Sequence, residues 1–313
     1  MSKRLAYTLS LLLLLLVSIA IAKLIEVRTM PIPPNKIVGE ALFKKPETIG
    51  PIIIKDTIHI AGYFNFIDSL ITAYDSITNY RLTEHLLINA NSWIIDTLAH
   101  TDYYTMIQRD SFVYDQHQMI VLRPNNTLLI PDSLEAQSIL GAFKKTKIDI
   151  NLPEYKLRIL TDSVLMYSFP IRIGQNKRKY LKMGDRMTDL RTQTGKGYII
   201  GFRRNPDFYN PVTGKQFYYT QRDDKNMTLM PQIPWIETEI NGIRNGQLIH
   251  PTTNPNTLGK AYSNGCIGVK EGDAWRIYYH CPIGTPLDIR YDLHVPMTHD
   301  SILVLEDVYN IES

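Results

Sequence analysis

The sequence predicts a mainly β C-terminal domain, preceded by a small α+β segment and by an N-terminal hydrophobic helix. Three patterns in the 313 residues support this fold class: an uncharged apolar stretch at the start, helical hydrophobic spacing between residues 66 and 90, and repeated β-prone runs after residue 147. The spacing separates helices from strands, because side chains return to one face about every 3.6 residues in a helix and every second residue in a strand. We therefore expect two folded parts behind an N-terminal membrane or export segment.

The first 28 residues are predicted to be a signal anchor or a signal peptide. Lys3 and Arg4 precede an uncharged stretch of 18 residues, Leu5 to Ala22, which includes six consecutive leucines. At about 1.5 Å per residue, a helix of this length is close to the thickness of a bilayer core. The Ala-Ile-Ala sequence at 20–22 also fits a cleavage site, and a buried core helix is a third alternative. The first two alternatives both predict export of the rest of the chain.

Residues 29–55 are expected to form a tether, and residues 56–146 a small α+β segment. The tether contains five prolines and little hydrophobic periodicity, which favours extended backbone. In the segment that follows, apolar spacing predicts helices over residues 66–80 and 83–90.

Strands and a further helix are expected in the second half of this segment. Two β-prone runs, 119–122 and 127–130, are separated by Arg-Pro-Asn-Asn, which favours a turn. Asp132 followed by Glu135 is the pattern of a capping box, in which both ends of the first helical turn are hydrogen-bonded. A helix is therefore expected over residues 133–143, where it would link the two folded parts.

Residues 147–292 are predicted to form the β-rich domain, and residues 293–313 a C-terminal tail. The β-prone runs of this domain are 155–160, 164–173, 197–202 and 287–291. The stretch between residues 203 and 235 is too long and irregular for a simple hairpin, and loops of this kind are often flaps over a site. Its aromatic side chains are candidates to line a groove, with ordinary packing as an equal alternative: Tyr218, Tyr219 and Trp235.

Charge and cysteine content exclude several functional classes. Lys and Arg total 34 against 31 Asp and Glu, a net charge of +3, so we expect no nucleic-acid partner. Two cysteines, Cys266 and Cys281, are too few for a disulfide scaffold or a cysteine-rich zinc site. His280 beside Cys281 belongs to no Cys-x-x-Cys or His-Glu-x-x-His motif, so we expect no metal and no cofactor. A disulfide between the two cysteines and a single reactive thiol both remain open.

Cys266 and His250 are the strongest candidates for chemistry. They lie 16 residues apart, and their side chains can meet if residues 248–249 end a strand and the turn at 263–266 returns toward it. Thiolate is the nucleophilic form of cysteine, and a neighbouring imidazole can take up its proton. Gly265 fits such a turn, because a residue without Cβ lets successive backbone N–H groups point toward one oxyanion. A buried structural thiol is the alternative if the two residues are considered alone.

The longer sequence around these residues resembles the catalytic domain of the L,D-transpeptidases, the YkuD-type enzymes of bacterial cell-wall synthesis. That family's signature is a His, then on average more than a dozen residues, then Ser/Thr-His-Gly-Cys. Here His250 is followed by twelve residues and then by Ser-Asn-Gly-Cys at 263–266. Residues 151–157 resemble the opening strand of the family and residues 284–289 its closing strand, so the resemblance covers most of 147–291. It implies a YkuD-like β-sandwich or barrel with a short helix after the Cys turn.

The resemblance implies a role for each residue of the motif. Cys266 would be the nucleophile and His250 its base, supported by the adjacent Pro251 and Thr252. The turn would form the oxyanion and substrate site through Ser263, Asn264 and Gly265. Independently of the resemblance, Asp273 is expected to cap the helix behind this turn.

Two positions depart from the family pattern. Asn264 stands where the family usually has His, so its amide can donate a hydrogen bond but cannot carry a proton. Gly268 stands where Arg or Asn is common, which removes a side chain that could hold a substrate carboxylate or brace the turn. Three basic residues are candidates to compensate: Arg244, Lys260 and Lys270.

The resemblance implies a peptidoglycan L,D-transpeptidase that cross-links stem peptides through a Cys thioester and releases terminal D-Ala. Two alternatives remain: an L,D-carboxypeptidase with water as the acceptor, and a non-catalytic cell-wall-binding protein, which the departures at Asn264 and Gly268 would favour. Residues 122–131 resemble the end of a LysM-like module, which would add glycan strands as partners, and a helical spacer is the alternative. We expect an exported protein, in the periplasm or on the periplasmic face of the bacterial inner membrane, attached through its N-terminal segment if this is not cleaved.

Overall fold

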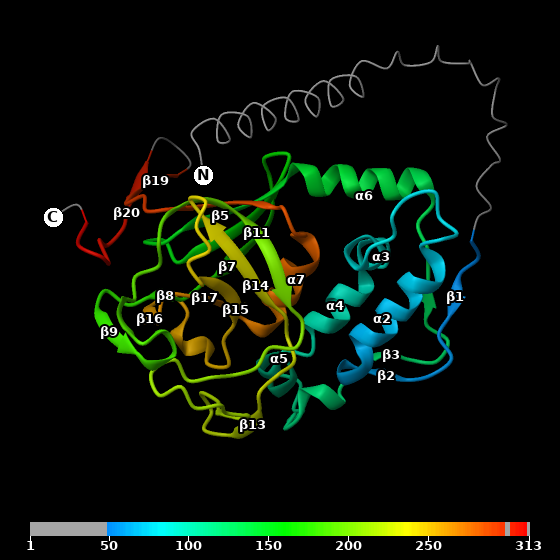
Figure 1. The fold of residues 1–313 in the computed structure, drawn as a ribbon, viewed down its shortest axis with the longest axis horizontal. Coiled ribbons are helices and arrows are strands. Elements are labelled where there is room, and N and C mark those ends of the chain that lie inside the picture. The colour runs from blue at the N-terminus through cyan, green and yellow to red at the C-terminus, as the bar shows by residue number, and fades with distance from the viewer. Residues whose placement is uncertain (1–48, 298–300, 312–313) are drawn as a thin grey trace, which may run out of the picture. The chain divides into compact units, whose positions relative to one another are not determined.

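The computed structural model describes residues 49–297 and 301–311. The predicted N-terminal hydrophobic helix and most of the predicted tether lie outside these residues. Among the described residues, no helix is long and apolar enough to cross a membrane. The described residues belong to one compact unit, in which a helical segment is followed by a β-rich domain (Figure 1).

The helical segment contains short helices and two small pairs of strands. Its elements are β1 (Ile52–Ile53), β2 (Ile58–His59), α2 (Ile60–Tyr74), α3 (Glu84–Ala90), α4 (Trp93–Ala99), α5 (Tyr103–Ile107), η1 (Gln116–Gln118), β3 (Ile120–Leu122), β4 (Thr127–Leu128) and α6 (Ser133–Lys145). β1 pairs with β4, and β2 pairs with β3. The fold therefore includes a strand at residues 52–53, inside the range predicted as tether.

The predicted helix over 66–80 is shifted toward the N-terminus. Helix α2 begins at Ile60, because Ile60 and Tyr63 lie on the same buried face as Ile67 and Leu70. The predicted runs at 119–122 and 127–130 form β3 and β4 around a turn, and each pairs with a strand from residues 52–59. Helices α4 and α5 were not predicted.

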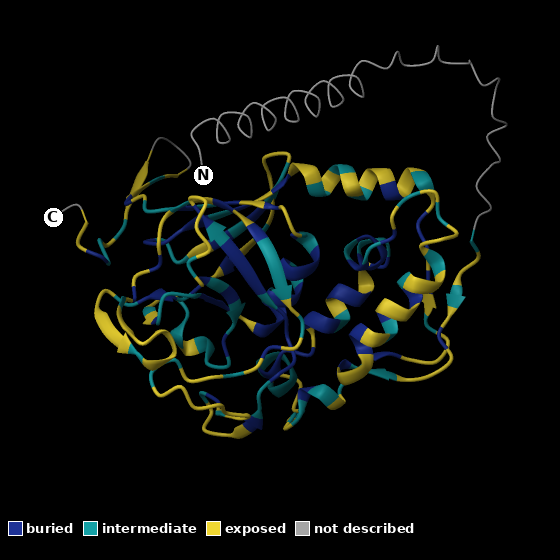
Figure 2. Cartoon of the chain, viewed as in Figure 1, coloured by how far each residue is buried: buried dark blue, intermediate teal, exposed yellow. Residues whose placement is uncertain are grey.

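Two helix starts agree with the sequence prediction at atomic detail. The Thr83 side chain accepts a hydrogen bond from the Leu86 N–H at 3.2 Å, which begins α3. The Asp132 carboxylate accepts from the N–H groups of Leu134 and Glu135, both at 2.9 Å, and this begins α6. Such caps satisfy backbone donors that have no partner inside the helix. Most of α6 is exposed to solvent (Figure 2).

The mainly β C-terminal domain that the sequence predicts is confirmed. It is built on an eight-stranded sheet in the order β17-β15-β14-β11-β18-β5-β6-β7. These strands are β5 (Thr146–Asn151), β6 (Lys156–Thr161), β7 (Val164–Pro170), β11 (Gly195–Arg203), β14 (Trp235–Ile240), β15 (Leu248–Pro251), β17 (Ile267–Val269) and β18 (Pro286–Arg290). The β15–β17 and β18–β5 pairs are parallel and the others are antiparallel.

The two edges of this sheet are brought together, which gives it a nearly closed, barrel-like form. The chain continues from β7 into β8 (Ile173–Gly174), which pairs with β16 (Ala261–Ser263). Between β7 and β8, Arg172 forms an antiparallel bridge with Gly268 of the opposite edge strand β17. Closing a sheet leaves no long unpaired edge, and here the closure passes directly beside Cys266.

Three short hairpins surround the barrel. They are β9 (Arg178–Leu181) with β10 (Arg186–Asp189), joined through η2 (Lys182–Gly184); β12 (Tyr219–Gln221) with β13 (Met227–Leu229); and β19 (His294–Pro296) with β20 (Ile302–Val304). The range 203–235, predicted as irregular, thus contains a hairpin. The range 293–313, predicted as a tail, contains another, and its Tyr309 is only 3% exposed.

Residues 151–157 do not form one opening strand, as the resemblance implied. Residue 151 ends β5, residues 156–157 begin β6, and between them lies a turn in which Tyr155 has a φ of 53° and donates its N–H to the Leu152 carbonyl at 3.0 Å. The opening strand is β5, and its Ile148 and Ile150 alternate into the core. The short helix after the Cys turn is confirmed as α7 (Glu271–His280), but Asp273 lies in its first turn, and the N-cap is Lys270.

Helix α7 joins the helical segment to the sheet. Its Trp275, Tyr278 and Tyr279 are fully buried, and Tyr63 and Phe64 of α2 pack against the Trp275 ring. Buried residues of both parts form one hydrophobic core. Polar groups add to this contact at Glu84, which accepts hydrogen bonds from the hydroxyls of Tyr278 at 3.0 Å and Tyr279 at 2.8 Å.

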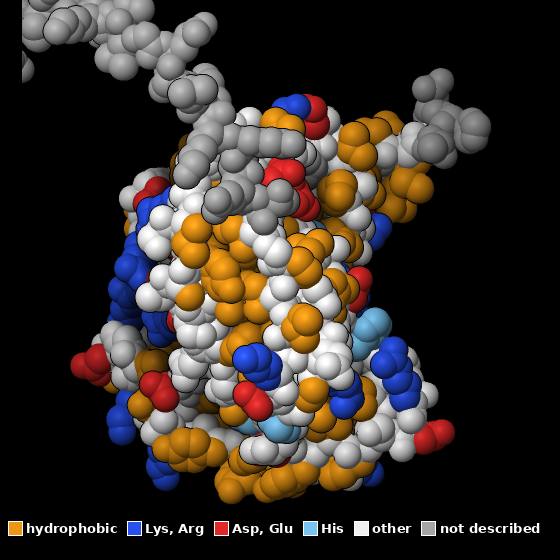
Figure 3. Space-filling model, turned by 90° about the vertical axis from the view of Figure 1, so that its right-hand side faces the viewer, with side chains coloured by type: hydrophobic (Ala, Val, Ile, Leu, Met, Phe, Trp, Pro, Cys, Tyr) orange, Lys and Arg blue, Asp and Glu red, His pale blue; other side chains and the backbone are white. Residues whose placement is uncertain are grey.

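The side of the molecule formed by the helical segment also exposes apolar groups. Figure 3 shows hydrophobic side chains in the middle of this face, among polar atoms. Ile53 in β1 is 61% exposed, and Leu129, which follows β4, is 48% exposed. Isolated apolar side chains of this kind are usual on protein surfaces.

Candidate active site

The predicted Cys turn connects β16 to β17 and has a fixed internal structure. The Ser263 hydroxyl donates to the Cys266 carbonyl at 2.5 Å and accepts from the Gly265 N–H at 3.2 Å. Gly265 adopts a φ of 114°, a conformation that side chains disfavour. Asn264 is half-buried at the same turn. The Gly265 N–H is already hydrogen-bonded to Ser263. The candidate oxyanion donor of this turn is therefore the N–H of Cys266.

His250 lies on the strand next to the Cys turn. Strands β15 and β17 run parallel, and His250 is opposite Gly268, two residues beyond Cys266. Residues opposite each other in neighbouring strands share a face, as do residues i and i+2 of one strand. Cys266 is the last residue of the turn before β17, so this register puts His250 beside the chain segment that carries Cys266. Both residues are half-buried, so part of each is accessible.

The orientation of the His250 ring determines which nitrogen can act as a base. Nδ1 lies 2.9 Å from the Pro251 carbonyl oxygen, which can only accept a hydrogen bond. Nδ1 therefore carries the proton of the neutral imidazole, and the lone pair of Nε2 is free. Thr252, the other residue expected to support His250, donates its N–H to Val269 at 2.8 Å and fixes the end of β15 against β17.

The surroundings of the pair favour a neutral resting state. Burial lowers the pKa of His250 to about 4, and the nearby positive charge of Arg172 acts in the same direction. Burial raises the pKa of the Cys266 thiol. The Leu248 backbone and the Arg172 guanidinium have the opposite, smaller effect and lower this pKa. A neutral thiol and a neutral imidazole are thus the resting forms near pH 7.

The two cysteines differ in environment and are not bonded to each other. Both are free; Cys266 is partly exposed, whereas Cys281 at the end of α7 is buried. Burial raises the pKa of the Cys281 thiol well above its usual range. Cys266 is therefore the thiol that a substrate can reach.

A hydrogen-bond chain that the sequence analysis missed braces the turn from behind. The Thr192 hydroxyl donates to the Gly265 carbonyl at 3.0 Å and accepts from the Gly174 N–H at 2.8 Å. The buried Tyr309 hydroxyl accepts from the Thr192 N–H at 3.1 Å and donates to the Gly174 carbonyl at 2.9 Å. Thr192 and Tyr309 stand 74 and 43 residues from Cys266, so no local sequence pattern indicates them.

The loop between β11 and β14 lies beside His250. Trp235, at the start of β14, contacts the imidazole, with ring centroids 5.3 Å apart. It also lines a surface hollow of about 420 Å³, together with Met183, Arg203, Asn205, Pro206, Asp207 and Tyr209. This hollow is a candidate substrate groove next to the His250 ring. Tyr218 and Tyr219, the other aromatic candidates, are 59% and 52% exposed.

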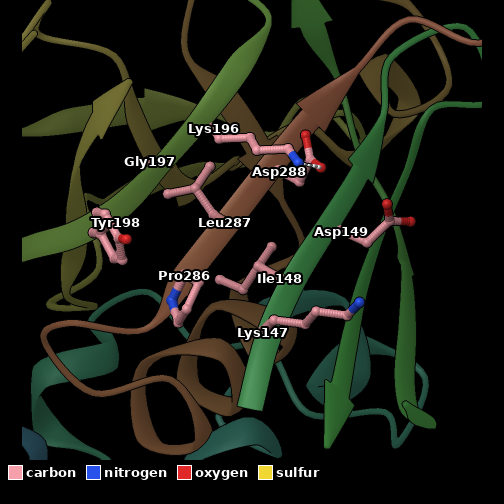
Figure 4. A pocket seen from close by; sticks show the side chains of 9 residues that line it. All are labelled: Lys147, Ile148, Asp149, Lys196, Gly197, Tyr198, Pro286, Leu287 and Asp288. Carbon is pink, nitrogen blue, oxygen red and sulfur yellow. Dashed lines mark ion pairs between the residues drawn. The ribbon is translucent and has the colours of Figure 1, made fainter. Parts of the chain in front are cut away.

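A second hollow, of about 330 Å³, lies on β5, β11 and β18 (Figure 4). Its lining includes charges of both signs, with Lys196 Nζ 3.9 Å from Asp288 Oδ2. β14 separates these strands from β15, so this hollow is not part of the candidate site. Among the described residues, no group of three or more His, Cys, Asp or Glu side chains is placed to hold a metal ion.

Replacing Gly265 with alanine is expected to lower the free energy of unfolding by about 1–3 kcal/mol, because a side chain is strained at this φ. A Cβ would meet only the Leu190 carbonyl, at an ordinary distance of 3.7 Å, so backbone conformation and not crowding is the cause. Gly62→Ala is the matched control: it lies inside α2 with open space around it, and alanine there should stabilise by up to about 1 kcal/mol. Urea unfolding of both variants measures the difference, and equal effects would contradict the strain.

Comparisons with known proteins concern the β-rich domain. Residues 145–289 match the family model of the L,D-transpeptidase catalytic domain, YkuD. An L,D-transpeptidase from Xylanimonas cellulosilytica is 12% identical, with a TM-score of 0.35 over 78% of this chain and 100% of the other. L,D-transpeptidases from Mycobacterium smegmatis and Mycobacterium tuberculosis H37Rv are 13% and 15% identical, with TM-scores of 0.32 and 0.31 over 47% of this chain.

This chain spans 58% and 57% of the length of those two mycobacterial structures. No curated protein sequence matches it. The family match covers all eight strands of the main sheet up to β18, the Cys turn and α7. The β-rich part of the chain, residues 145–289, therefore belongs to the YkuD family of L,D-transpeptidase catalytic domains.

Proposed function

We propose that this protein is a peptidoglycan L,D-transpeptidase in which Cys266 is the nucleophile and His250 the general base. The observation that carries the proposal is the parallel pairing of β15 with β17, in which His250 is opposite Gly268, two residues after Cys266. The family match at residues 145–289 supports the reaction class. Family membership also favours an exported protein that works on the cell wall.

The proposed first half-reaction forms a thioester. His250 Nε2 takes the thiol proton as the Cys266 sulfur attacks the carbonyl carbon at the L-centre of the third stem residue. The Cys266 N–H stabilises the oxyanion. The C–N bond to terminal D-Ala then breaks, the leaving amine receives the proton from His250, and the acyl group remains on sulfur.

In the second half-reaction an amine of another stem attacks the thioester and gives its proton to His250. The C–S bond breaks, the thiol is restored, and an amide cross-link is formed. With water as the acceptor the same steps give an L,D-carboxypeptidase. A wall-binding protein without catalysis is the third possibility, and Asn264 at the usual His position is the feature that favours it.

Mass spectrometry of tetrapeptide muropeptides incubated with the full-length protein tests the proposal. Loss of D-Ala with formation of dimers is the expected result. Loss of D-Ala without dimers would assign the carboxypeptidase reaction instead. No change in product masses, together with undiminished binding of wall sacculi by Cys266→Ala, would contradict an enzymatic function and favour the binding protein.

The rate of D-Ala release is expected to vary by less than about twofold between pH 5.5 and 7.5. His250 must be neutral to accept the thiol proton, and with a pKa of about 4 it stays neutral over this range. An imidazole with an ordinary pKa near 6.5 would lose about tenfold toward the acid end. Arg172 is the charged group that acts on the pKa of His250, and it also lowers this pKa. A fall in rate centred near pH 6.5 would contradict the buried, neutral base.

A further inference from the structure

Gly268 leaves a space that another side chain fills. A Cβ built on Gly268 would lie 2.5 Å from Arg172 Nε, 2.7 Å from Cγ and 2.9 Å from Cδ. Real Cβ atoms essentially never approach other atoms so closely, so the arginine side chain crosses the face of Gly268. The glycine at this position is thus matched to an arginine that stands 96 residues earlier in the sequence.

The backbone holds Arg172 in this place. Its N–H donates to the Gly268 carbonyl at 2.9 Å, and the Gly268 N–H donates to the Arg172 carbonyl at 3.0 Å. On its other side Gly268 is paired with His250. His250, Gly268 and Arg172 therefore lie abreast on three neighbouring segments, with their side-chain positions on one face. Cys266, two residues before Gly268, shares that face.

The guanidinium of Arg172 has few protein partners. Its Nη1 donates to Thr257 Oγ1 at 3.3 Å, while its buried Nε has no hydrogen-bond partner. The groups whose ionised forms would stabilise its charge are Cys266 and Tyr262. A buried cation is costly unless an anion or hydrogen bonds compensate it, and the forming thiolate is the anion at hand.

We propose that Arg172 is the cation that stabilises the Cys266 thiolate, and that Gly268 is glycine because this arginine crosses it. Arg172 acts through Cys266, and so is a positioning residue for the nucleophile. The three basic residues expected from the sequence do not take this role. Arg244 pairs with Glu237, and Lys260 and Lys270 are exposed. The inference deepens the proposed function, but it concerns the thiol itself and can be tested without turnover.

The test is the pH dependence of alkylation of Cys266 by iodoacetamide, followed by peptide mass spectrometry that separates Cys266 from Cys281. In Arg172→Gln we expect the thiol to titrate at higher pH and alkylation near pH 7.5 to slow by about tenfold, since one pKa unit changes the thiolate fraction tenfold. Arg172→Lys should keep most of the rate, because it keeps the charge. Arg186→Gln on the exposed strand β10 is the matched control and should leave the profile unchanged.

Exchanging the two positions provides a second test. Gly268→Arg alone should lower the melting temperature, because its Cβ collides with Arg172. Adding Arg172→Ala should recover the melting temperature, and should alkylate faster near pH 7.5 than Arg172→Ala alone, because a guanidinium is again on this face. If the double variant recovers neither the melting temperature nor the alkylation rate, the proposed relation between Gly268 and Arg172 is wrong.

An unchanged alkylation profile in Arg172→Gln would overturn the proposal, whether or not the wild type releases D-Ala. If that variant instead raised KM for the tetrapeptide with an unchanged thiol profile, Arg172 would be a substrate-carboxylate contact, and the proposal would also fail. Conversely, a shifted profile in a protein that forms no product would uphold the role of Arg172 while contradicting the proposed transpeptidase.

Discussion

Cys266→Ala is expected to reduce D-Ala release from tetrapeptide stems by at least about 1,000-fold. The variant keeps the candidate oxyanion donor and the candidate groove but lacks the sulfur of the proposed thioester. Alanine fits the space of a half-buried cysteine, so the melting temperature should change little. The measurement is the initial rate of D-Ala release, with the thermal melt recorded on the same preparation.

Cys281→Ala is the matched control, because it removes the other thiol. Cys281 is buried at the end of α7, and burial raises its pKa far above the working range. Its replacement should leave the rate within about twofold, while the lost sulfur costs some stability in the core. A fully active Cys266→Ala variant, or a Cys281→Ala variant that is folded and inactive, would contradict the assignment of the nucleophile.

Local sequence patterns predicted the elements whose causes are local. Thr83 and Asp132 were recognisable as helix starts because a cap depends only on the next few residues. The alternation of Ile148 and Ile150 marks β5 equally locally, but it was not used, and this strand was not predicted. The opening strand was misplaced because residues 151–157 were assigned by resemblance, although Pro153 and the positive φ of Tyr155 belong to a turn.

The site was only partly predictable for the same reason. His250 and Cys266 fall within one short stretch, and the turn between them restricts how they can meet. Arg172 comes to the site through closure of the sheet, and Thr192 and Tyr309 through packing behind the turn. These contacts join segments far apart in sequence, and neither hydrophobic period nor motif spacing encodes such pairings. No local pattern therefore indicates Arg172 as the basic residue beside Gly268.

Arg222→Ala is expected to lower the free energy of unfolding by about 3–5 kcal/mol, because it leaves a buried carboxylate without its counter-charge. Arg222 forms an ion pair with Glu271, and both side chains are 2% exposed. The guanidinium also donates from Nε to Thr228 Oγ1 at 2.8 Å and lies 4.4 Å from the centre of the Tyr103 ring. The ion pair thus ties the β12–β13 hairpin to the first turn of α7, next to α5.

Two comparison variants separate burial from charge. Lys145→Ala breaks an exposed pair with Asp162, whose side chains are 59% and 69% exposed, and should cost no more than about 1 kcal/mol. Replacing Arg222 and Glu271 together with methionines should recover most of the loss, because neither charge then remains buried. Urea unfolding gives all three values. Similar losses in Arg222→Ala and Lys145→Ala would contradict the role assigned to the buried pair.

The loss in Arg222→Ala should become smaller as the pH falls. Burial raises the pKa of Glu271 and Arg222 lowers it, so removing Arg222 raises that pKa further. A carboxyl group whose folded pKa lies above its unfolded value takes up a proton first in the folded state, and stability then increases as the pH falls through the folded pKa. The variant should therefore be closer to the wild type at pH 5 than at pH 7.5. A loss of stability that is the same at pH 5 and pH 7.5 would mean that Glu271 becomes solvent-exposed when Arg222 is removed. The β12–β13 hairpin would then be detached from α7. It would no longer hold Thr220 against Thr253, which lies beside the strand that carries His250.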